Sequence, residues 1–548
     1  MTINNHNTIE WWRGGAIYQV YPRSFYDANG DGIGDLQGIT EKMDYIASLG
    51  VEGVWISPFF KSPMKDFGYD VADFRQIDGI FGTMEDFDNL LEKAHSLGLK
   101  IIIDLVLSHT SDQHEWFQQS CKGGATNEKS DWYVWAAPKA DGTPPNNWHS
   151  FFGGPAWTFN AHRGQYYLHN FLKEQPDLNY HNPDVQEEML NIARFWLDKG
   201  VDGFRLDVVN FYFHDQELRD NPPVTDDYEG NACTQYEGLW PYTMQQHIYD
   251  RSRPETLEFL KKIRTLCDEY DDRFLVGEIG DDTPFALAAE YTKGSDRLHT
   301  AYSTAMMAGQ STTVKTEDFV LPVTAERDIN GQSWPCWAFS NHDTVRVATR
   351  WEKNNPDNDP QFVKMLMTAL TSLRGSFCIY QGEELGLKEA QLKFEDLVDP
   401  WGIALWPEWQ GRDGCRTPMP WNEYMPNAGF STEEAKPWLP VCRKHYPTAV
   451  RQQELDENSI LNFTKNLLHW RKEHPVLQRG DIEFLDYGQN ILAFKRVDKD
   501  HEYTCLFNLK SDDERIELGK PVSGLYSLGA DISGSTVFLS SFGFAIVD

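Results

Sequence analysis

Short apolar segments that alternate with amphipathic segments constrain this chain more than any other feature of its sequence. Eight apolar segments recur, at residues 15–22, 51–58, 100–108, 201–209, 273–280, 298–303, 335–341 and 375–382. Between them lie helical patterns such as 84–98 and 185–200, in which apolar residues recur every three or four positions. Strands that alternate with helices indicate a parallel sheet, and eight such units close into a (β/α)8 TIM barrel. We therefore predict an α/β barrel as the main domain.

Two regions depart from this alternation, in a chain of 548 residues that is too long for one hydrophobic core. Residues 110–176 follow the third strand and are rich in Trp, Gly, Pro and Asn. A loop of that length predicts an inserted subdomain. Residues 475–548 change to short alternating strands, which are typical of a C-terminal antiparallel β domain, here expected to be a sandwich. The barrel domain is then expected to comprise residues 1–109 and 177–474.

Charge and composition argue against several classes of function. The formal net charge is −33, so a nucleic acid or an anionic membrane would repel the protein. No run of about 18 apolar residues predicts a membrane span. The first residues show no signal-peptide pattern, and the eight cysteines are scattered without metal-ligand spacing. We expect a cytoplasmic monomer or homodimer that acts on a small molecule.

Polar residues gather near the carboxyl ends of four predicted strands, where TIM barrels place their active sites. They are Asp104 and His109, Arg205 and Asp207, Glu278, and His342 and Asp343. Carboxylates without a Cys/His cluster indicate acid/base chemistry with a carboxylate nucleophile, of which glycoside hydrolysis is the leading example. The arginine would keep its neighbouring carboxylate ionised, and an acid catalyst would need a raised pKa.

Several ordered motifs carry a resemblance to a known family. The segments DLVLSH (104–109), GFRLDVVN (203–210), GEIG (277–280) and SNHD (340–343) resemble the four conserved regions of the α-amylase superfamily, glycoside hydrolase family 13. The segment QPDLN (175–179) resembles the additional motif of its oligo-1,6-glucosidase-like branch, and IYQVYPRSF, FGYDV, QGEELG and GRDGCRTPMPW also match. The resemblance extends from about residue 11 to the end, and is nearest to bacterial α-glucosidases.

This resemblance implies a retaining, exo-acting α-glucosidase that releases glucose from the non-reducing end of short α-glucosides and also transfers it. It implies that Asp207 is the nucleophile, Glu278 the general acid/base, and Asp343 the residue that stabilises the transition state. The residues that would contact the sugar are Asp66, Tyr69, His109, Phe152, Phe171, Arg205, His342, Glu389, Arg412 and Arg416. For the two phenylalanines core packing is nearly as good an interpretation, and one of the last two arginines is expected to anchor a loop.

Other functions within the superfamily stay open. They are a sugar-rearranging enzyme such as a trehalose synthase or sucrose isomerase, a non-catalytic scaffold, and an endo-acting amylase, which the DFGYD segment (66–70) disfavours. The residue after the presumed nucleophile is Val208. In the resembling branch, valine at this position accompanies cleavage of α-1,6 bonds, and threonine accompanies maltase-type activity.

The segment DANGDGIGD (27–35) has oxygen ligands at the spacing of the first part of an EF-hand loop. The candidate ligands are Asp27, Asn29, Asp31, the Ile33 carbonyl and Asp35. The twelfth position of an EF-hand loop normally carries a glutamate that binds the ion through both oxygens, but counting from Asp27 this position is Gly38. An Asp/Asn/Gly turn without an ion is the simpler alternative. We expect one structural Ca²⁺ or Mg²⁺ and no organic cofactor.

Overall fold

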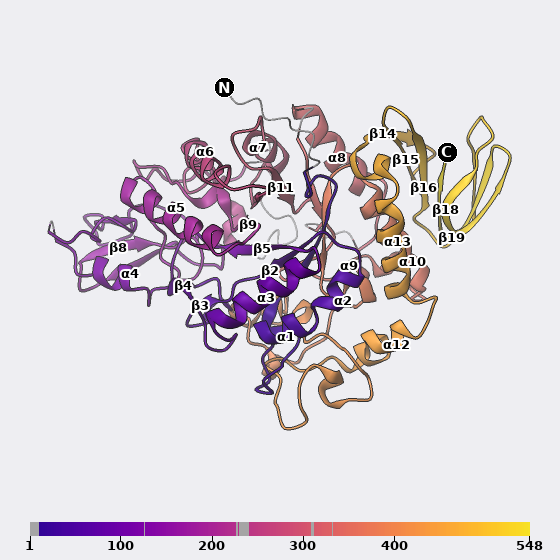
Figure 1. Ribbon diagram of the computed structural model, residues 1–548. Coiled ribbons are helices and arrows are strands. Elements are labelled where there is room, and N and C mark those ends of the chain that lie inside the picture. Colours follow the sequence, from indigo (N-terminus) through magenta and orange to yellow (C-terminus); the bar gives the residue numbers. More distant parts are fainter. Residues whose placement is uncertain (1–9, 125, 226–227, 229–239, 308–311, 331–332) are drawn as a thin grey trace.

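A closed barrel of eight parallel strands forms the centre of the molecule, which confirms the predicted fold class (Figure 1). The structure is a computed structural model that describes residues 10–548, except 125, 226–227, 229–239, 308–311 and 331–332. The barrel strands are β1 (Ala16–Val20), β2 (Gly53–Ile56), β5 (Lys100–Leu105), β9 (Gly203–Leu206), β10 (Phe274–Glu278), β11 (Thr300–Ser303), β12 (Cys336–Ala338) and β13 (Ser376–Tyr380). Each strand pairs with its neighbour in chain order, and β13 closes on β1.

Helices surround the barrel because each presents one apolar stripe to it. In α3 (Met84–Ser96) the buried residues Phe87, Leu90, Leu91 and Ala94 recur at helical spacing, and a Thr83/Asp86 capping box begins the helix. The other principal helices are α1 (Leu36–Glu41), α2 (Met43–Ser48), α5 (Pro183–Asp198), α6 (Thr256–Cys267), α7 (Pro284–Tyr291), α8 (Glu317–Asn330), α10 (Pro360–Ser372) and α13 (Ile460–Lys472). Shorter helices are α4 (Glu115–Ser120), α9 (Val347–Arg350), α11 (Pro400–Leu405), α12 (Val450–Glu454) and α14 (Pro475–Arg479). None of the described helices is long and apolar enough to cross a membrane.

Two small sheets lie in the connections after β2 and β5. The loop that contains the DFGYD segment lies between two paired strands, β3 (Phe60–Lys61) and β4 (Asp73–Ile77). No sequence pattern predicted this strand pair. After β5, the strands β6 (Trp135–Ala136), β7 (Trp157–Asn160) and β8 (Gln165–Leu168) form a three-stranded sheet inside the predicted insertion. This part of the chain, with α4, projects to the left of the barrel in Figure 1.

The C-terminal strands form an antiparallel sheet, as predicted, and the long last strand hydrogen-bonds to three of the others. The sandwich arrangement stays a prediction. The strands are β14 (Asp481–Asp486), β15 (Ile491–Val497), β16 (Glu502–Asn508), β17 (Glu514–Glu517), β18 (Gly524–Ser533) and β19 (Thr536–Val547). The last strand, β19, is 12 residues long, where the sequence pattern predicts short strands. Its backbone is irregular at Phe542, whose φ is +52°. The residues before this point, Thr536–Leu539, pair with β17, and those after it, Phe544–Val547, pair with β16.

The barrel interior changes from apolar to charged along the strands. Inward-facing residues alternate along each strand, so Ile102 of β5 is followed by Asp104, and Val276 of β10 by Glu278. Asp104 and Val276 both lie level with Arg205 of β9 in the strand register. The apolar end of the barrel therefore forms a core, and the opposite end collects ionisable groups.

Close strand packing leads to a stability prediction for Gly203, the first residue of β9. A Cβ atom added there would lie 2.4 Å from the backbone oxygen of Phe274. Since backbone atoms cannot move aside cheaply, Gly203→Ala is expected to lower the free energy of unfolding by about 1–3 kcal/mol. Urea unfolding followed by circular dichroism measures this change. Gly79→Ala is the control, because no atom lies within 4 Å of its added Cβ; equal losses in the two variants would contradict the interpretation.

Candidate active site

One arginine binds three carboxylates at the charged end of the barrel. Nη1 of Arg205 lies 2.8 Å from Asp104 and 2.5 Å from Asp207, and Nη2 lies 2.6 Å from Glu278. All four residues come from the ends of β5, β9 and β10, so neighbouring strands deliver them to one place. The backbone N–H of Val208 also donates to Glu278, at 3.3 Å.

Burial controls the protonation of these carboxyl groups. It raises the pKa of Asp104 to about 6 and that of Glu278 to about 7, while the charge of Arg205 opposes both shifts. Burial also raises the pKa of Asp207, and the Arg205 ion pair again acts in the opposite direction. Because a single guanidinium cannot balance three negative charges, the group retains protons at higher pH than free carboxylic acids would.

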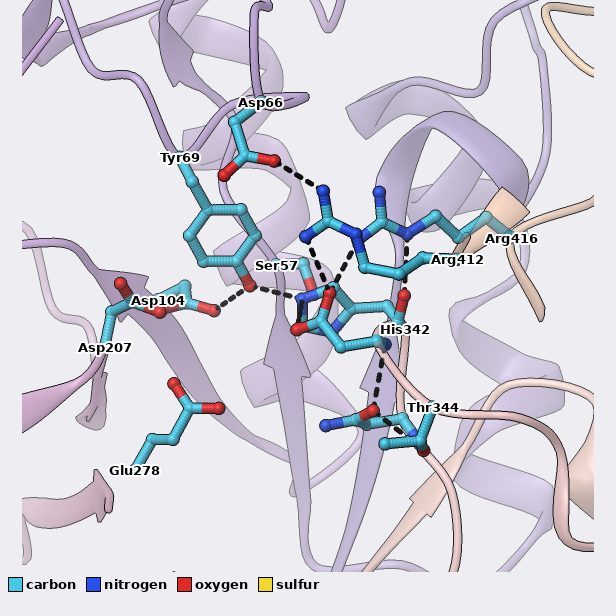
Figure 2. A network of polar contacts seen from close by, with 12 residues as sticks. Ser57, Asp66, Tyr69, Asp104, Asp207, Glu278, His342, Thr344, Arg412 and Arg416 are labelled. Atoms are coloured by element: carbon cyan, nitrogen blue, oxygen red, sulfur yellow. Dashed lines mark hydrogen bonds and ion pairs between the residues drawn. The ribbon is translucent and has the colours of Figure 1, made fainter. Parts of the chain in front are cut away.

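A second group of charges, which includes Arg412 and Arg416, faces Asp207 and Glu278 in Figure 2. Asp343 is at the centre of this group. Its Oδ1 lies 2.6 Å from Arg416 and 3.2 Å from Arg412, and its Oδ2 lies 3.0 Å from Nε2 of His342. Burial would raise the pKa of Asp343, but His342 and the two arginines outweigh it and hold that pKa well below its usual range. At a pH at which Glu278 can hold a proton, Asp343 is therefore ionised.

The loop between β3 and β4 brings Asp66 and Tyr69 to the same place. Asp66 accepts from Arg412 at 2.9 Å, which links the loop to the Asp343 group. The hydroxyl of Tyr69 donates to Asp104 at 2.9 Å and lies 2.8 Å from His342, so it joins the two groups of charges (Figure 2). The structure thus connects residues that are more than 300 positions apart in the sequence.

Histidine and aromatic side chains surround this network. The pKa of His109 is lowered to about 4 by burial, so its ring is neutral at pH 7; its Nε2 lies 3.0 Å from the Tyr69 carbonyl. Phe171 lies 5.3 Å from the His109 ring, and Phe152 lies under the Arg412 guanidinium at 5.2 Å. Both phenylalanines also contact each other, at 6.1 Å between ring centroids.

Glu389 differs from the other predicted sugar contacts. Its carboxylate accepts from the backbone N–H of Arg346 at 3.0 Å, and a Cβ on Gly414 would lie 2.3 Å from it. These contacts place Glu389 behind the turn that carries Arg412 and Arg416. A direct contact between Glu389 and sugar stays a prediction.

Several residues that build the site escaped the sequence analysis. Asp399 binds Arg412 through both carboxylate oxygens, at 2.9 and 3.1 Å, so this arginine is itself firmly anchored. Asp399 precedes a proline at the start of α11 and also caps that helix, which is the role its sequence context indicates. Gln175, in the QPDLN segment, donates to Asp66 at 3.1 Å. Asp70 accepts from the backbone N–H groups of Lys65 and Asp66 at 2.8 and 3.0 Å and so shapes the loop.

The predicted metal loop adopts a tightly hydrogen-bonded turn. Asp27 accepts from the N–H groups of Gly30 and Gly32, both at 2.7 Å, and Asp31 accepts from Ile33 at 2.8 Å. Asn29 accepts from Asp31, and Asp35 caps α1 by accepting from Gly38. Within the described part of the chain, no three His, Cys, Asp or Glu side chains gather in a group that could hold a metal ion.

Comparison with known proteins identifies the family of the chain. The sequence model described as "Alpha amylase, catalytic domain" matches residues 19–480. The chain belongs to the α-amylase family. Within the family, the chain is 53% identical to a protein of Rhizobium meliloti named "Probable alpha-glucosidase", over 93% of this chain and 91% of that protein. It is 38% identical to an oligo-1,6-glucosidase of Heyndrickxia coagulans, over 87% and 88% of the two chains.

A solved structure extends this similarity to three dimensions. The crystal structure of an α-glucosyl transfer enzyme superposes with a TM-score of 0.94 at 48% sequence identity, and covers 98% of this chain and 99% of the other. This structural similarity covers the barrel, the insertion and the C-terminal sheet together.

The Arg205 ion pairs lead to a pH-dependent stability prediction. Arg205→Met leaves three buried carboxyl groups without a cation, which is expected to lower the free energy of unfolding by about 3–5 kcal/mol at pH 8. The loss should shrink toward pH 5. Each of these carboxyl groups has a higher pKa in the folded protein than in the unfolded chain. Its protonation therefore stabilises the fold fully at a pH below the unfolded-state pKa, and this stabilisation is lost as the pH rises through the folded-state pKa.

Calorimetric melting temperatures at pH 5 and pH 8 test this expectation. Arg219→Met is the matched control, since it removes a half-exposed arginine that pairs with Asp215. A wild-type to Arg205→Met difference that is the same at both pH values would show that the carboxyl groups are not coupled to Arg205.

Proposed function

We propose that the protein is a retaining, exo-acting α-glucosidase that releases glucose from short α-glucosides and transfers it to other sugars. The observation that supports this most is the pairing of Asp207 and Glu278 on the two terminal nitrogens of Arg205. This arrangement sets the two carboxyl groups side by side. It fits the separation of about 5–5.5 Å that retaining glycosidases use better than the wider spacing of inverting ones.

The residues divide the reaction between them. The Asp207 carboxylate attacks the anomeric carbon while the bond to the leaving oxygen breaks, and protonated Glu278 gives its proton to that oxygen. Glu278 then takes a proton from water, whose oxygen attacks the anomeric carbon and releases Asp207. When a sugar hydroxyl replaces the water, the same step gives a new glucoside. The net configuration is retained because inversion occurs twice.

The opposite group of charges fits one terminal glucose unit. Arg412 forms ion pairs with both Asp66 and Asp343, so sugar hydroxyls would find both donors and acceptors here. His109 and His342 lie beside this group, and the pKa of each is lowered by burial. Ionised Asp343 would also stabilise the positive charge that develops on the sugar ring in the transition state. These contacts support an exo-acting enzyme.

The contacts described so far do not determine which linkage is cleaved, where the protein is located or how it assembles. Val208 lies next to the nucleophile and its N–H contacts Glu278, so its side chain is suited to contact the sugar that leaves. Because valine at this position accompanies cleavage of α-1,6 bonds in the resembling branch, we propose an isomaltose preference. A cytoplasmic location, and a monomer or homodimer, stay predictions.

Two active-site variants test the catalytic assignment. Asp207→Asn is expected to release no glucose from maltose or isomaltose. Glu278→Gln is expected to lower kcat for both disaccharides by about 10²–10⁴-fold, because it removes the general acid. It should still form a glucosyl-enzyme from α-glucosyl fluoride, whose leaving group needs no proton. Mass spectrometry of the intact protein detects this adduct as one added glucosyl unit.

The wild-type product pattern is the companion measurement. Free glucose from short substrates supports the proposal, and the maltose-to-isomaltose ratio reports on Val208. Disaccharide isomers without free glucose would indicate a sugar-rearranging enzyme, and mixed oligomers from starch an endo-acting one. An Asp207→Asn variant as active as the wild type would exclude the assigned nucleophile, and a wild type inactive on every substrate would favour a scaffold.

We also propose that the loop at residues 27–35 holds one structural Ca²⁺ or Mg²⁺. Its side-chain donors are all oxygens, which suits a hard cation. The fit is incomplete in one respect, because the Asp27 and Asp31 carboxylates accept N–H groups of their own loop. An ion would therefore bind through oxygens that these hydrogen bonds leave available. Its role would be to stabilise the loop, without a part in the chemistry.

Metal removal tests this second proposal. After treatment with a chelator, adding Ca²⁺ or Mg²⁺ at 100 times its Kd should stabilise the wild type by about 2.7 kcal/mol. Differential scanning calorimetry measures the corresponding rise in Tm. Asp31→Ala should abolish the rise, whereas Asp141→Ala, in the exposed turn at Asp141–Thr143, should retain it. An unchanged wild-type Tm would leave the simple turn as the correct interpretation.

A further inference from the structure

Phe67 has an unusual backbone conformation at the edge of the proposed glucose pocket. Its φ is +53°, a left-handed value that bulky residues rarely adopt. It follows Asp66 directly, and the N–H of Tyr69 donates to the Asp66 carbonyl at 3.1 Å, which closes the turn. The direction of both pocket side chains therefore depends on how Phe67 is held. Such conformations persist only where the surroundings enforce them.

Two residues distant in the sequence contact the Phe67 side chain. The guanidinium of Arg23 lies 4.4 Å from the ring centroid of Trp438 and 5.1 Å from that of Phe67. The Phe67 and Trp438 ring centroids are 5.5 Å apart, and the rings are tilted by 54°, so the three side chains form one cluster, called here the Arg23 cluster. Arg416, which binds Asp343, lies 5.5 Å from the same Phe67 ring. Phe67 thus connects the Arg23 cluster to the ion pairs of the pocket.

Arg23 is buried without the partners that a buried guanidinium normally has. It is 7% exposed, and its Nε has no hydrogen-bond partner among the described residues. Its Nη1 contacts only the sulfur of Met64, at 3.8 Å, within the described hydrogen bonds. Burying a cation in this way is costly, and cation–π contacts recover only part of that cost. Stability alone therefore does not explain why an arginine occupies this position.

We propose that Arg23 and Trp438 are positioning residues that set the affinity of the pocket for the terminal glucose. They do so by holding Phe67 in its left-handed conformation, which aims Asp66 and Tyr69 at the sugar. This inference rests on the proposed function, since it presupposes that Asp66 and Tyr69 bind a terminal glucose. Neither Arg23 nor Trp438 needs to touch the substrate.

Four variants test the inference. Arg23→Met and Trp438→Ala should each raise KM for maltose about three- to tenfold, while kcat changes less than twofold. Trp438→Phe keeps an aromatic ring and should restore most of the affinity. Arg13→Met is the matched control, because Arg13 lies 4.8 and 5.0 Å from the Trp12 and Trp334 rings before β1, at the other end of the barrel. Its KM should equal that of the wild type.

A binding measurement keeps this test independent of turnover. Isothermal titration calorimetry with 1-deoxynojirimycin, a glucose-shaped imino sugar, should show the same three- to tenfold loss of affinity in Arg23→Met. The Tm of Arg23→Met should not fall, since methionine replaces a buried guanidinium that forms no ion pair with the described residues. A lower Tm with unchanged KM and Kd would show a purely structural role and overturn the inference.

The two proposals fail in different ways. A wild type that hydrolyses no α-glucoside contradicts the proposed function, while the imino-sugar Kd of Arg23→Met still decides the positioning role. A wild type that neither hydrolyses an α-glucoside nor binds the imino sugar overturns both. Normal hydrolysis with equal Kd values for wild type and Arg23→Met overturns only the inference.

Discussion

The Arg205 guanidinium is the contact on which the rest of the active site depends. Asp104, Asp207 and Glu278 come from three adjacent strands, and without a shared cation they would repel one another in a buried environment. The barrel register places Arg205 level with Asp104. The charge layer can therefore form directly above an apolar core, with no loop needed to bring these groups together.

The second half of the site is assembled differently, because it comes from long connections. Asp343 follows β12, Asp66 lies in the loop between β3 and β4, and Arg412 lies in the connection after β13. No strand ladder fixes these segments relative to one another. Their relative positions rest on ion pairs, above all the one between Asp66 and Arg412 and the anchoring of Arg412 by Asp399. Backbone pairing of the strands thus positions the residues around Arg205, whereas ion pairs between side chains position the residues around Asp343.

This division explains what could be predicted from the sequence. The eight barrel strands follow from periodicity, and strand-end residues such as Asp207 and Glu278 are visible because their neighbours are apolar. The partner of Arg412 was not visible, since Asp399 is indistinguishable in sequence from an ordinary helix cap. The left-handed conformation of Phe67 also leaves no sequence signal, because the residues that contact its side chain, Arg23 and Trp438, come from distant segments. The C-terminal sheet was predicted, but not the continuity of β19 through Phe542.

The balance of charge in the whole site bears on the chemistry. Six carboxyl groups belong to the two groups of ion pairs, against three arginines: Asp66, Asp104, Asp207, Glu278, Asp343 and Asp399 against Arg205, Arg412 and Arg416. His109 does not offset the difference, because burial holds its pKa at about 4. With one proton on Glu278, as the proposed mechanism requires, the negative charges of the site still outnumber the positive ones. An oxocarbenium-like transition state is positively charged whereas the substrate is neutral, so under the proposed mechanism this surplus would stabilise the transition state selectively. The arginines would then hold the carboxylates in place without cancelling that surplus.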